Sequence, residues 1–220
     1  MSIVTIVPLR SPGLGKTRLA DRLDADERAG LAGAMLADVV AAIRGCGLER
    51  VVLAASGPGA VAAGAALDLE VVVDPPDVGT LDHAIEHARV ACGGQQDVLV
   101  VQADLPALTA DDVAAVLAAD AAVVVAPTDD GGTSALLRRP GGVIDTRYGP
   151  DSARRHVDGA KAAGIEVVVV GRAGFCMDVD TAADLSRMST TLSIGAATAD
   201  FLKENPMFDA PRGHENDRRR

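Results

Sequence analysis

Aromatic side chains are scarce in this chain of 220 residues, which has no tryptophan, one tyrosine and three phenylalanines. The hydrophobic core must therefore consist of Val, Ala and Leu, and this favours helices layered on a parallel sheet. A basic surface is missing as well, since the net charge is -10. Because binding to a phosphate backbone depends on clustered Lys and Arg, we expect no nucleic-acid partner.

Cysteine is also rare, and long apolar runs are absent. The three cysteines, Cys46, Cys92 and Cys176, are odd in number and lack CxxC spacing, so the sequence indicates neither a disulfide framework nor a zinc site. We expect reduced, mostly buried thiols. No run approaches the ~20 apolar residues that span a bilayer, and the N-terminus has no basic region before an apolar one. We therefore expect a cytoplasmic protein without membrane contact.

Short apolar runs alternate with helical or loop segments along most of the chain. Strands are predicted at residues 3–7, 51–54, 70–73, 98–101, 122–126 and 166–170, with the first ended by Pro8. Helices are predicted from Asp24 to about residue 45, over 80–92 and 152–163, and after Thr109 and Thr181. This order predicts an α/β fold, a single-domain, three-layer, doubly wound and mainly parallel sheet over residues 1–204, with a disordered tail at 205–220.

The strongest functional signal is an acidic residue that follows a wholly apolar strand. Residues 98–101 do not alternate, which is typical of a strand covered on both faces, and Asp104 comes just after them. Ligands of open α/β sheets bind outside the carboxyl ends of the strands. Asp104 is therefore expected where a metal or a nucleotide binds.

A second pair of acids has the spacing of one face of an extended chain. Asp178 and Asp180 are two residues apart, so their side chains point to the same side of extended backbone. Together with Asp104 they could hold Mg²⁺, which takes carboxylates and completes its shell with water and substrate phosphates. The alternative is that Asp178 or Asp180 only caps the following helix.

Three loops contain residues suited to anions. Residues 10–18 combine glycines with Arg10, Lys16 and Arg18, but Arg10 stands where a Walker P-loop requires glycine, so a P-loop is not favoured. Residues 128–133 and 148–152 also follow the pattern of ordinary turns, although Ser152 begins a helix whose N-terminus could hold phosphate or carboxylate. The four histidines form no recognised ligand group and are interpreted as structural.

Taken in order, the segments 7–9, 16–20, 103–106, 130–133, 148–156 and 178–181 resemble the phosphoenolpyruvate and 2-phospho-L-lactate guanylyltransferases of coenzyme F-420 biosynthesis. The resemblance extends to about Met188. It implies a nucleotidyltransferase fold (Rossmann-like, GT-A-like) that is related to molybdopterin guanylyltransferases and nucleotide-sugar enzymes. It also implies Mg²⁺ as cofactor, and GTP and phosphoenolpyruvate as substrates.

The resemblance assigns roles to matching positions. Lys16, Arg18 and Asp104 would act in catalysis, with Lys16 and Arg18 on the triphosphate, and Asp104, Asp178 and Asp180 would bind the metal. The acceptor would lie against Thr133, Gly149 and Ser152. The nucleotide would contact Pro8, Leu9, Lys16, Gly79 and Asp82.

The sequence leaves alternatives to this function. The acceptor could instead be 2-phospho-L-lactate or 3-phospho-D-glycerate, which differ only beside the carboxylate. A metal-dependent glycosyltransferase would also use an Asp-x-Asp pair, but the order of motifs fits it poorly. A nucleotide-binding regulatory relative without chemistry is the non-enzyme alternative, and a transient contact with the next enzyme of the pathway is expected if the product is labile.

Overall fold

A seven-stranded sheet organises the protein. The structure is a computed structural model that describes residues 3–10, 19–20, 22–75, 79–176, 178–181, 184 and 193–205. The strands run in the order β3-β2-β1-β4-β6-β5-β7, and only β6 is antiparallel to its neighbours among these described strands. Their bounds are β1 Ile3–Arg10, β2 Val51–Ser56, β3 Glu70–Val73, β4 Asp97–Val101, β5 Val123–Pro127, β6 Thr133–Arg138 and β7 Val167–Val169.

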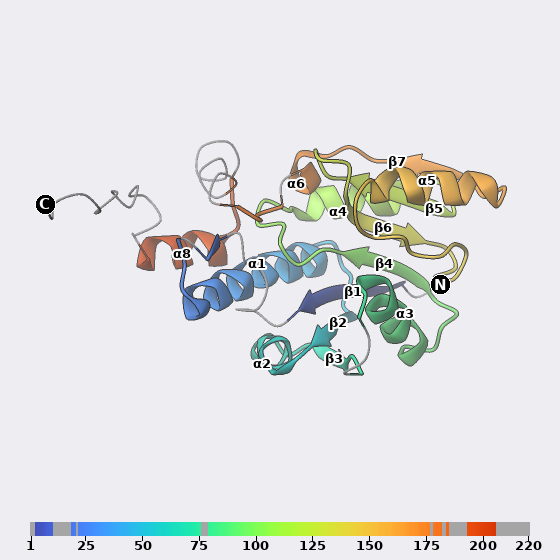
Figure 1. Ribbon diagram of the computed structural model, residues 1–220. Coiled ribbons are helices and arrows are strands. Elements are labelled where there is room, and N and C mark those ends of the chain that lie inside the picture. The colour runs from blue at the N-terminus through green and yellow to red at the C-terminus, as the bar shows by residue number, and fades with distance from the viewer. Residues whose placement is uncertain are drawn as a thin grey trace, which may run out of the picture.

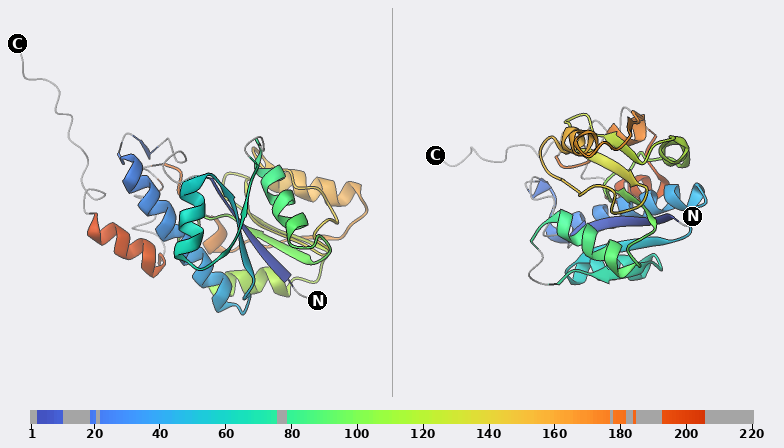
Figure 2. Two further views of the ribbon diagram at one scale, coloured as in Figure 1. Left: turned by 90° about the horizontal axis from the view of Figure 1, so that it is seen from below. Right: turned by 90° about the vertical axis from the view of Figure 1, so that its right-hand side faces the viewer.

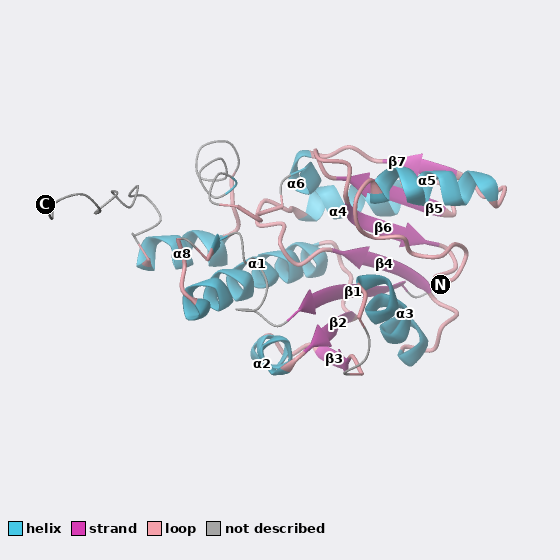
Figure 3. Ribbon diagram, viewed as in Figure 1, coloured by secondary structure: helices cyan, strands magenta, loops and turns pink. Residues whose placement is uncertain are grey.

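Helices cover both faces of the sheet, as Figures 1 and 2 show. One face packs against α1, α2, α4 and α6, and the other packs against α3 and α5. The mixed, mostly parallel α/β fold that the sequence predicts is thereby confirmed. Figure 3 shows the helices in cyan. Their bounds are α1 Ala25–Gly45, α2 Pro58–Ala66, α3 Leu81–Ala91, α4 Ala110–Ala118, α5 Ser152–Ala162, α6 Ala173–Cys176 and α8 Ala196–Glu204.

The predicted helix starts are confirmed by their caps. Asp24 accepts a hydrogen bond from the Glu27 N–H, and the Glu27 carboxylate accepts one from the Asp24 N–H, each at 2.8 Å. Thr109 forms the equivalent capping box with Asp112 at the start of α4. These pairs satisfy N–H groups that no helical carbonyl can reach, so they fix where each helix begins.

Two predictions about strands were wrong. Pro8 does not end the first strand: β1 continues to Arg10, and Pro8 lies in register with Ala54 of β2. The ladder from β1 to β4 covers only residues 3–6 of β1, so the N–H that proline lacks is not needed there. The second error concerns β6, which was not predicted; Thr133 is its first residue rather than the end of a loop.

The C-terminal helix α8 packs on α1, beside which it lies in Figure 1. The buried Asp38 carboxylate of α1 accepts the N–H groups of Ala197 and Thr198 at 3.0 and 2.9 Å, and so caps α8. Residues 206–220, most of the predicted tail, lie outside the described residues. All three cysteines are free, though only Cys92 is fully buried. Within the described part of the chain, no helix has the length and apolarity to cross a bilayer.

Candidate active site

Three carboxylates meet at the carboxyl edge of the sheet. Asp104 follows β4, while Asp178 and Asp180 follow α6, and one oxygen of each lies within 4.8 Å of the others. Burial raises the pKa of Asp178 to about 6, and the charges of Asp104 and Asp180 add to this increase. Such crowding disfavours three negative charges without a cation. Because hard divalent cations take carboxylate oxygens, this cluster fits Mg²⁺.

The extended backbone at residues 178–180 explains how two of these acids reach one place. Val179 is completely buried in a small core with α1 and α8, so its neighbours point the other way, as the spacing predicts. The next residue, Thr181, exchanges hydrogen bonds with Asp184: its hydroxyl accepts the Asp184 N–H at 3.2 Å, and Asp184 accepts the Thr181 N–H at 2.8 Å. The predicted capping box therefore belongs to Thr181 and Asp184.

A pocket of about 330 Å³ opens on one side of the acids. Its walls are mainly apolar and come from the end of β1, from α1 and from the start of α3, and the predicted residues Pro8 and Leu9 belong to them. Asp104 and Asp180 stand at one end. Ser56 and Asp74, at the carboxyl ends of β2 and β3, also line it. A mainly apolar pocket with acids in its wall suits a nucleotide whose phosphates reach a metal.

A smaller pocket of about 150 Å³ lies on the other side of the acids. Thr133, Gly149 and Ser152, the three predicted acceptor residues, all line it, together with Asp178. Asp104 lines both pockets. The antiparallel direction of β6 produces this arrangement, because its first residue lies at the edge where the parallel strands end. Two ligands would thus meet at the acid cluster.

Hydroxyl groups in the second pocket form an ordered chain with His156. The His156 Nε2 accepts the backbone N–H of Arg147 at 2.8 Å, so the ring proton must be on Nδ1. This Nδ1–H faces the Thr133 Oγ1 at 3.1 Å, and the Ser152 Oγ lies 2.9 Å from the same oxygen. One of the two hydroxyl protons joins Thr133 to Ser152. The other remains available to an anionic ligand.

Burial keeps this histidine neutral. His156 is completely buried, and burial, opposed by the charge of Asp82 and aided by Arg138, lowers the pKa of the imidazole to about 4. The Tyr148 ring packs edge-on against it, with ring centroids 5.1 Å apart. His156 therefore acts at neutral pH as a fixed hydrogen-bond donor rather than as a charge.

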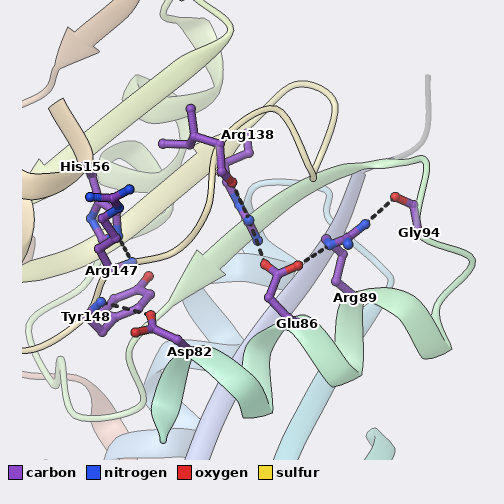
Figure 4. A network of polar contacts seen from close by, with 9 residues as sticks. Asp82, Glu86, Arg89, Gly94, Arg138, Arg147, Tyr148 and His156 are labelled. Carbon is purple, nitrogen blue, oxygen red and sulfur yellow. Dashed lines mark hydrogen bonds and ion pairs between the residues drawn. The ribbon is translucent and has the colours of Figure 1, made fainter. Parts of the chain in front are cut away.

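Asp82, a predicted nucleotide contact, is hydrogen-bonded to the loop before α5. Its Oδ1 accepts the Tyr148 N–H at 2.9 Å, so that α3 holds the loop before α5, as Figure 4 shows. On the same helix, Glu86 pairs with the buried Arg138 of β6 at 2.7 Å. These contacts tie the wall of the second pocket to the centre of the sheet. The role of Asp82 toward a nucleotide stays a prediction.

The predicted triphosphate contacts Lys16 and Arg18 lie outside the described residues. Arg10, the last residue of β1, lines the first pocket, and its guanidinium donates to the Gly79 carbonyl at 3.1 Å. Gly79, a predicted nucleotide contact, is thus connected to the pocket through Arg10. Arg10 therefore brings a cationic side chain to the first pocket.

Two residues of the site were not identified from the sequence. His156 was interpreted as structural because its partners are distant in sequence. Asp74 was overlooked, although it follows the apolar end of β3 just as Asp104 follows β4. The pattern of a strand followed by an acid would have found it.

The fold and the site together define a nucleotidyltransferase-like protein. Over 94% of this chain and 97% of the other, the structure is similar to one described as a nucleotide-diphospho-sugar transferase from Desulfovibrio desulfuricans G20, with a TM-score of 0.71 and 19% identity. It is also similar to a nucleotidyl transferase from Methanothermobacter, with a TM-score of 0.59 and 14% identity over 93% of this chain and 99% of the other.

Sequence comparison gives the family. Residues 3–218 match the family described as Guanylyl transferase CofC like, and the chain belongs to this family of guanylyltransferases. It is 36% identical to the phosphoenolpyruvate guanylyltransferase of Nocardia farcinica, over 92% of each chain. It is 39% identical to the 2-phospho-L-lactate guanylyltransferase of Halobacterium salinarum, over 82% of this chain and 81% of the relative.

Proposed function

We propose that the protein transfers GMP from GTP to phosphoenolpyruvate, forming enolpyruvyl-diphospho-guanosine and diphosphate in coenzyme F-420 biosynthesis. The observation that carries this proposal is the position of Asp104, which lines both pockets. The first pocket would hold GTP, and the second would hold the acceptor. Relatives named for phosphoenolpyruvate and for 2-phospho-L-lactate both match the chain, so the acceptor is the part that an experiment must decide.

The reaction would be an in-line displacement. A phosphate oxygen of the acceptor attacks the α-phosphorus of GTP, and the bond from that phosphorus to the β-bridging oxygen breaks, so that diphosphate leaves with the bonding electrons. Because the nucleophile is already an anion, no general base is needed and the protein supplies position and charge. Charge neutralisation at the α-phosphate is what Mg²⁺ supplies when Asp104, Asp178 and Asp180 hold it.

Other residues would position the two substrates. Thr133 and Ser152 offer the hydroxyl proton that His156 leaves available, and Gly149 lies in the same pocket wall. Ser152 is the first residue of α5, so its hydroxyl lies at the positive end of the helix dipole, which favours an anion. Lys16 and Arg18 would neutralise the triphosphate. These groups would bind and orient the two anionic substrates, and no covalent intermediate with the protein would form.

The test is release of diphosphate from GTP and Mg²⁺, with phosphoenolpyruvate, 2-phospho-L-lactate or 3-phospho-D-glycerate supplied separately and the product identified by mass. We expect release with phosphoenolpyruvate. Asp104→Asn should lower the rate at least about a hundredfold, because the charge at the reacting phosphate is no longer matched. Asp97→Asn, at the opposite end of β4, is the matched control and should retain activity.

The outcomes separate the alternatives. Release with another acceptor would preserve the reaction and change the substrate. GTP binding without release under any condition would favour a regulatory protein instead. A cytoplasmic location is part of the same proposal. So is a transient contact with the next enzyme, because a guanylylated enolpyruvate is expected to be labile.

A further inference from the structure

Asp74 has a carboxylate oxygen without a hydrogen-bond partner at the far end of the first pocket. The residue is only 8% exposed, yet within the described part of the chain its Oδ1 is buried and accepts no hydrogen bond. The other oxygen, Oδ2, accepts the hydroxyl of Ser56, and the Asp74 N–H donates to the Ala55 carbonyl at 2.9 Å. Backbone and side chain are therefore both held in place.

A buried acceptor without a partner is unfavourable, especially on an ionised group. Both Asp74 and Ser56 line the first pocket, so the Asp74 carboxyl group lies in the wall of the space that a ligand would fill. A ligand that donates hydrogen bonds there would remove the penalty. This observation requires a donor group on the ligand, not another anion.

The position of Asp74 tells which part of a nucleotide it would meet. Asp74 follows β3 and Asp104 follows β4, and β2 and β1 lie between these strands. Three strand spacings separate the two ends by about 14 Å. In a nucleoside triphosphate, the base edge is the part farthest from the α-phosphorus, whereas the ribose hydroxyls lie roughly midway. With the α-phosphate at Asp104, the base edge reaches Asp74.

The chemistry of the base edges then selects one base. Guanine presents two neighbouring donors, N1–H and the 2-amino group, which match the two oxygens of a carboxylate. Adenine and cytosine place an acceptor beside their amino group, and uracil flanks its single N–H with two carbonyls. The wall of this pocket includes the apolar side chains of Met35 and Leu81, and apolar side chains suit the faces of a planar ring system.

We infer that Asp74, oriented by Ser56, reads the N1–H and 2-amino edge of guanine and makes the first pocket selective for guanine nucleotides. This inference rests on the proposed function, since it takes the triphosphate to be at Asp104. It goes further by assigning base selectivity to a residue at the end of the sheet opposite to the acceptor pocket.

The experiment is a direct titration of the full-length protein with GTP, inosine triphosphate, xanthosine triphosphate and 2′-deoxy-GTP, without acceptor. Inosine lacks the 2-amino group, and xanthine has a carbonyl in its place. Each lost hydrogen bond to a charged group weakens binding by about tenfold to a hundredfold. We expect GTP and 2′-deoxy-GTP to bind equally, and inosine and xanthosine triphosphates to bind more weakly by this factor.

Asp74→Asn reverses the preference if the assignment is right. The amide replaces one acceptor by a donor, which opposes the 2-amino group of guanine and matches the 2-carbonyl of xanthine, so xanthosine triphosphate should bind more tightly than GTP. Glu70→Gln, on the same strand in an exposed ion pair with Arg50, is the matched control and should leave the order unchanged.

Three results would overturn the inference. Equal binding of GTP and inosine triphosphate would do so, as would an unchanged order in Asp74→Asn with a normal thermal melting temperature. A selective loss of 2′-deoxy-GTP in the wild type would place the ribose at Asp74 instead. Failure of the proposed function is seen separately, as absence of diphosphate release, because these titrations need no turnover.

Discussion

The His156 Nδ1 lies 3.1 Å from the Thr133 Oγ1, and this contact orders the protons of the second pocket. Because the Arg147 N–H occupies Nε2, the ring can only donate to Thr133. Thr133 and Ser152 are thereby left with one hydroxyl proton for a ligand. A histidine that touches no pocket space directly therefore decides whether the pocket presents a donor.

Two substitutions of His156 distinguish this role from simple packing. In His156→Asn the amide nitrogen stands near the position of Nδ1 and still donates to Thr133, whereas in His156→Gln the amide stands near Nε2. We expect the KM for the acceptor to rise about tenfold in His156→Gln and about threefold or less in His156→Asn, the range of one hydrogen bond. The KM for GTP should stay constant in both, measured by steady-state kinetics.

If both variants raised the two KM values in parallel, His156 would serve only the fold. Thr133→Ser is a useful control, since it keeps the hydroxyl and should retain most of the acceptor affinity.

The acid cluster should destabilise the metal-free protein. Asp178 is crowded by Asp104 and Asp180, so Asp178→Asn removes one of three repelling charges without changing the shape of the side chain. We expect the unfolding free energy without metal to rise by about 1 kcal/mol, which is about 2–4 °C in melting temperature for a chain of this size.

The same variant should lose the increase in melting temperature that Mg²⁺ gives the wild type. The exposed Asp120 provides the control: Asp120→Asn should change neither the metal-free melting temperature nor the response to Mg²⁺. A metal response in Asp178→Asn equal to that of the wild type would remove Asp178 from the metal site.

Acid should destabilise the fold through His156. The pKa of this imidazole is about 4 in the folded protein, against about 6.5 in an unfolded chain. Between these values the unfolded state binds a proton that the folded state does not, so stability is complete above pH ~6.5 and falls at about 1.4 kcal/mol per pH unit as the pH decreases toward 4.

His156→Asn cannot titrate, and Asp178, whose raised pKa acts in the opposite direction, is common to both proteins. The difference in unfolding free energy between wild type and His156→Asn, from urea titrations, should therefore decrease by about 2 kcal/mol from pH 7.5 to pH 5. A difference that does not vary with pH would mean that His156 binds its proton equally in the folded and unfolded states, so that its pKa is not lowered by folding.

Arg138 is completely buried, so its partner Glu86 should be important for stability. The Arg138 Nη1 donates to the Glu86 Oε1 at 2.7 Å and to the Ile144 carbonyl at 3.0 Å, as Figure 4 shows for the ion pair. Glu86→Ala leaves a buried charge without its counter-ion, which costs about 3–5 kcal/mol. Arg138→Met removes the charge as well and should cost less, measured by chemical unfolding.

Arg89→Ala tests whether the pair or the whole network matters. Arg89 donates to the other Glu86 oxygen at 2.6 Å but leaves Arg138 paired when it is removed, so we expect a loss of about 1 kcal/mol. Equal losses in Glu86→Ala and Arg89→Ala would contradict the prediction.

Local signals explain which parts of the protein the sequence could predict. Asp24 with Glu27, and Thr109 with Asp112, lie within one helical turn, so their caps were found without knowledge of the fold. The acids Asp178 and Asp180 were placed on one side by the alternation of extended backbone alone. Asp104 was placed at the carboxyl edge by the rule for open α/β sheets, whereas its grouping with Asp178 and Asp180 rested on the ligands that Mg²⁺ takes and on the family resemblance.

Long-range packing explains what was missed. The strand β6 contains Arg138, whose charge interrupts an apolar pattern and is tolerated only because Glu86, 52 residues away, neutralises it. The hydrogen bond from Arg147 to His156 requires the loop before α5 to fold back onto that helix. The Asp82 carboxylate accepts its hydrogen bond from the N–H of Tyr148, which is 66 residues away in the sequence. No pattern within a short window contains such pairs.

Because β6 lies between β4 and β5, the two halves of the sheet line different pockets, and this allows the pockets to be engineered separately. The walls of the first pocket come mainly from the chain before residue 105, and those of the second pocket come largely from residues after 127. In a chimera that takes residues 123–170 from a relative with another acceptor, we expect the acceptor specificity of that relative and the nucleotide specificity of this protein. In this arrangement the specificity for the proposed acceptor could change without a change in most of the walls of the proposed nucleotide pocket.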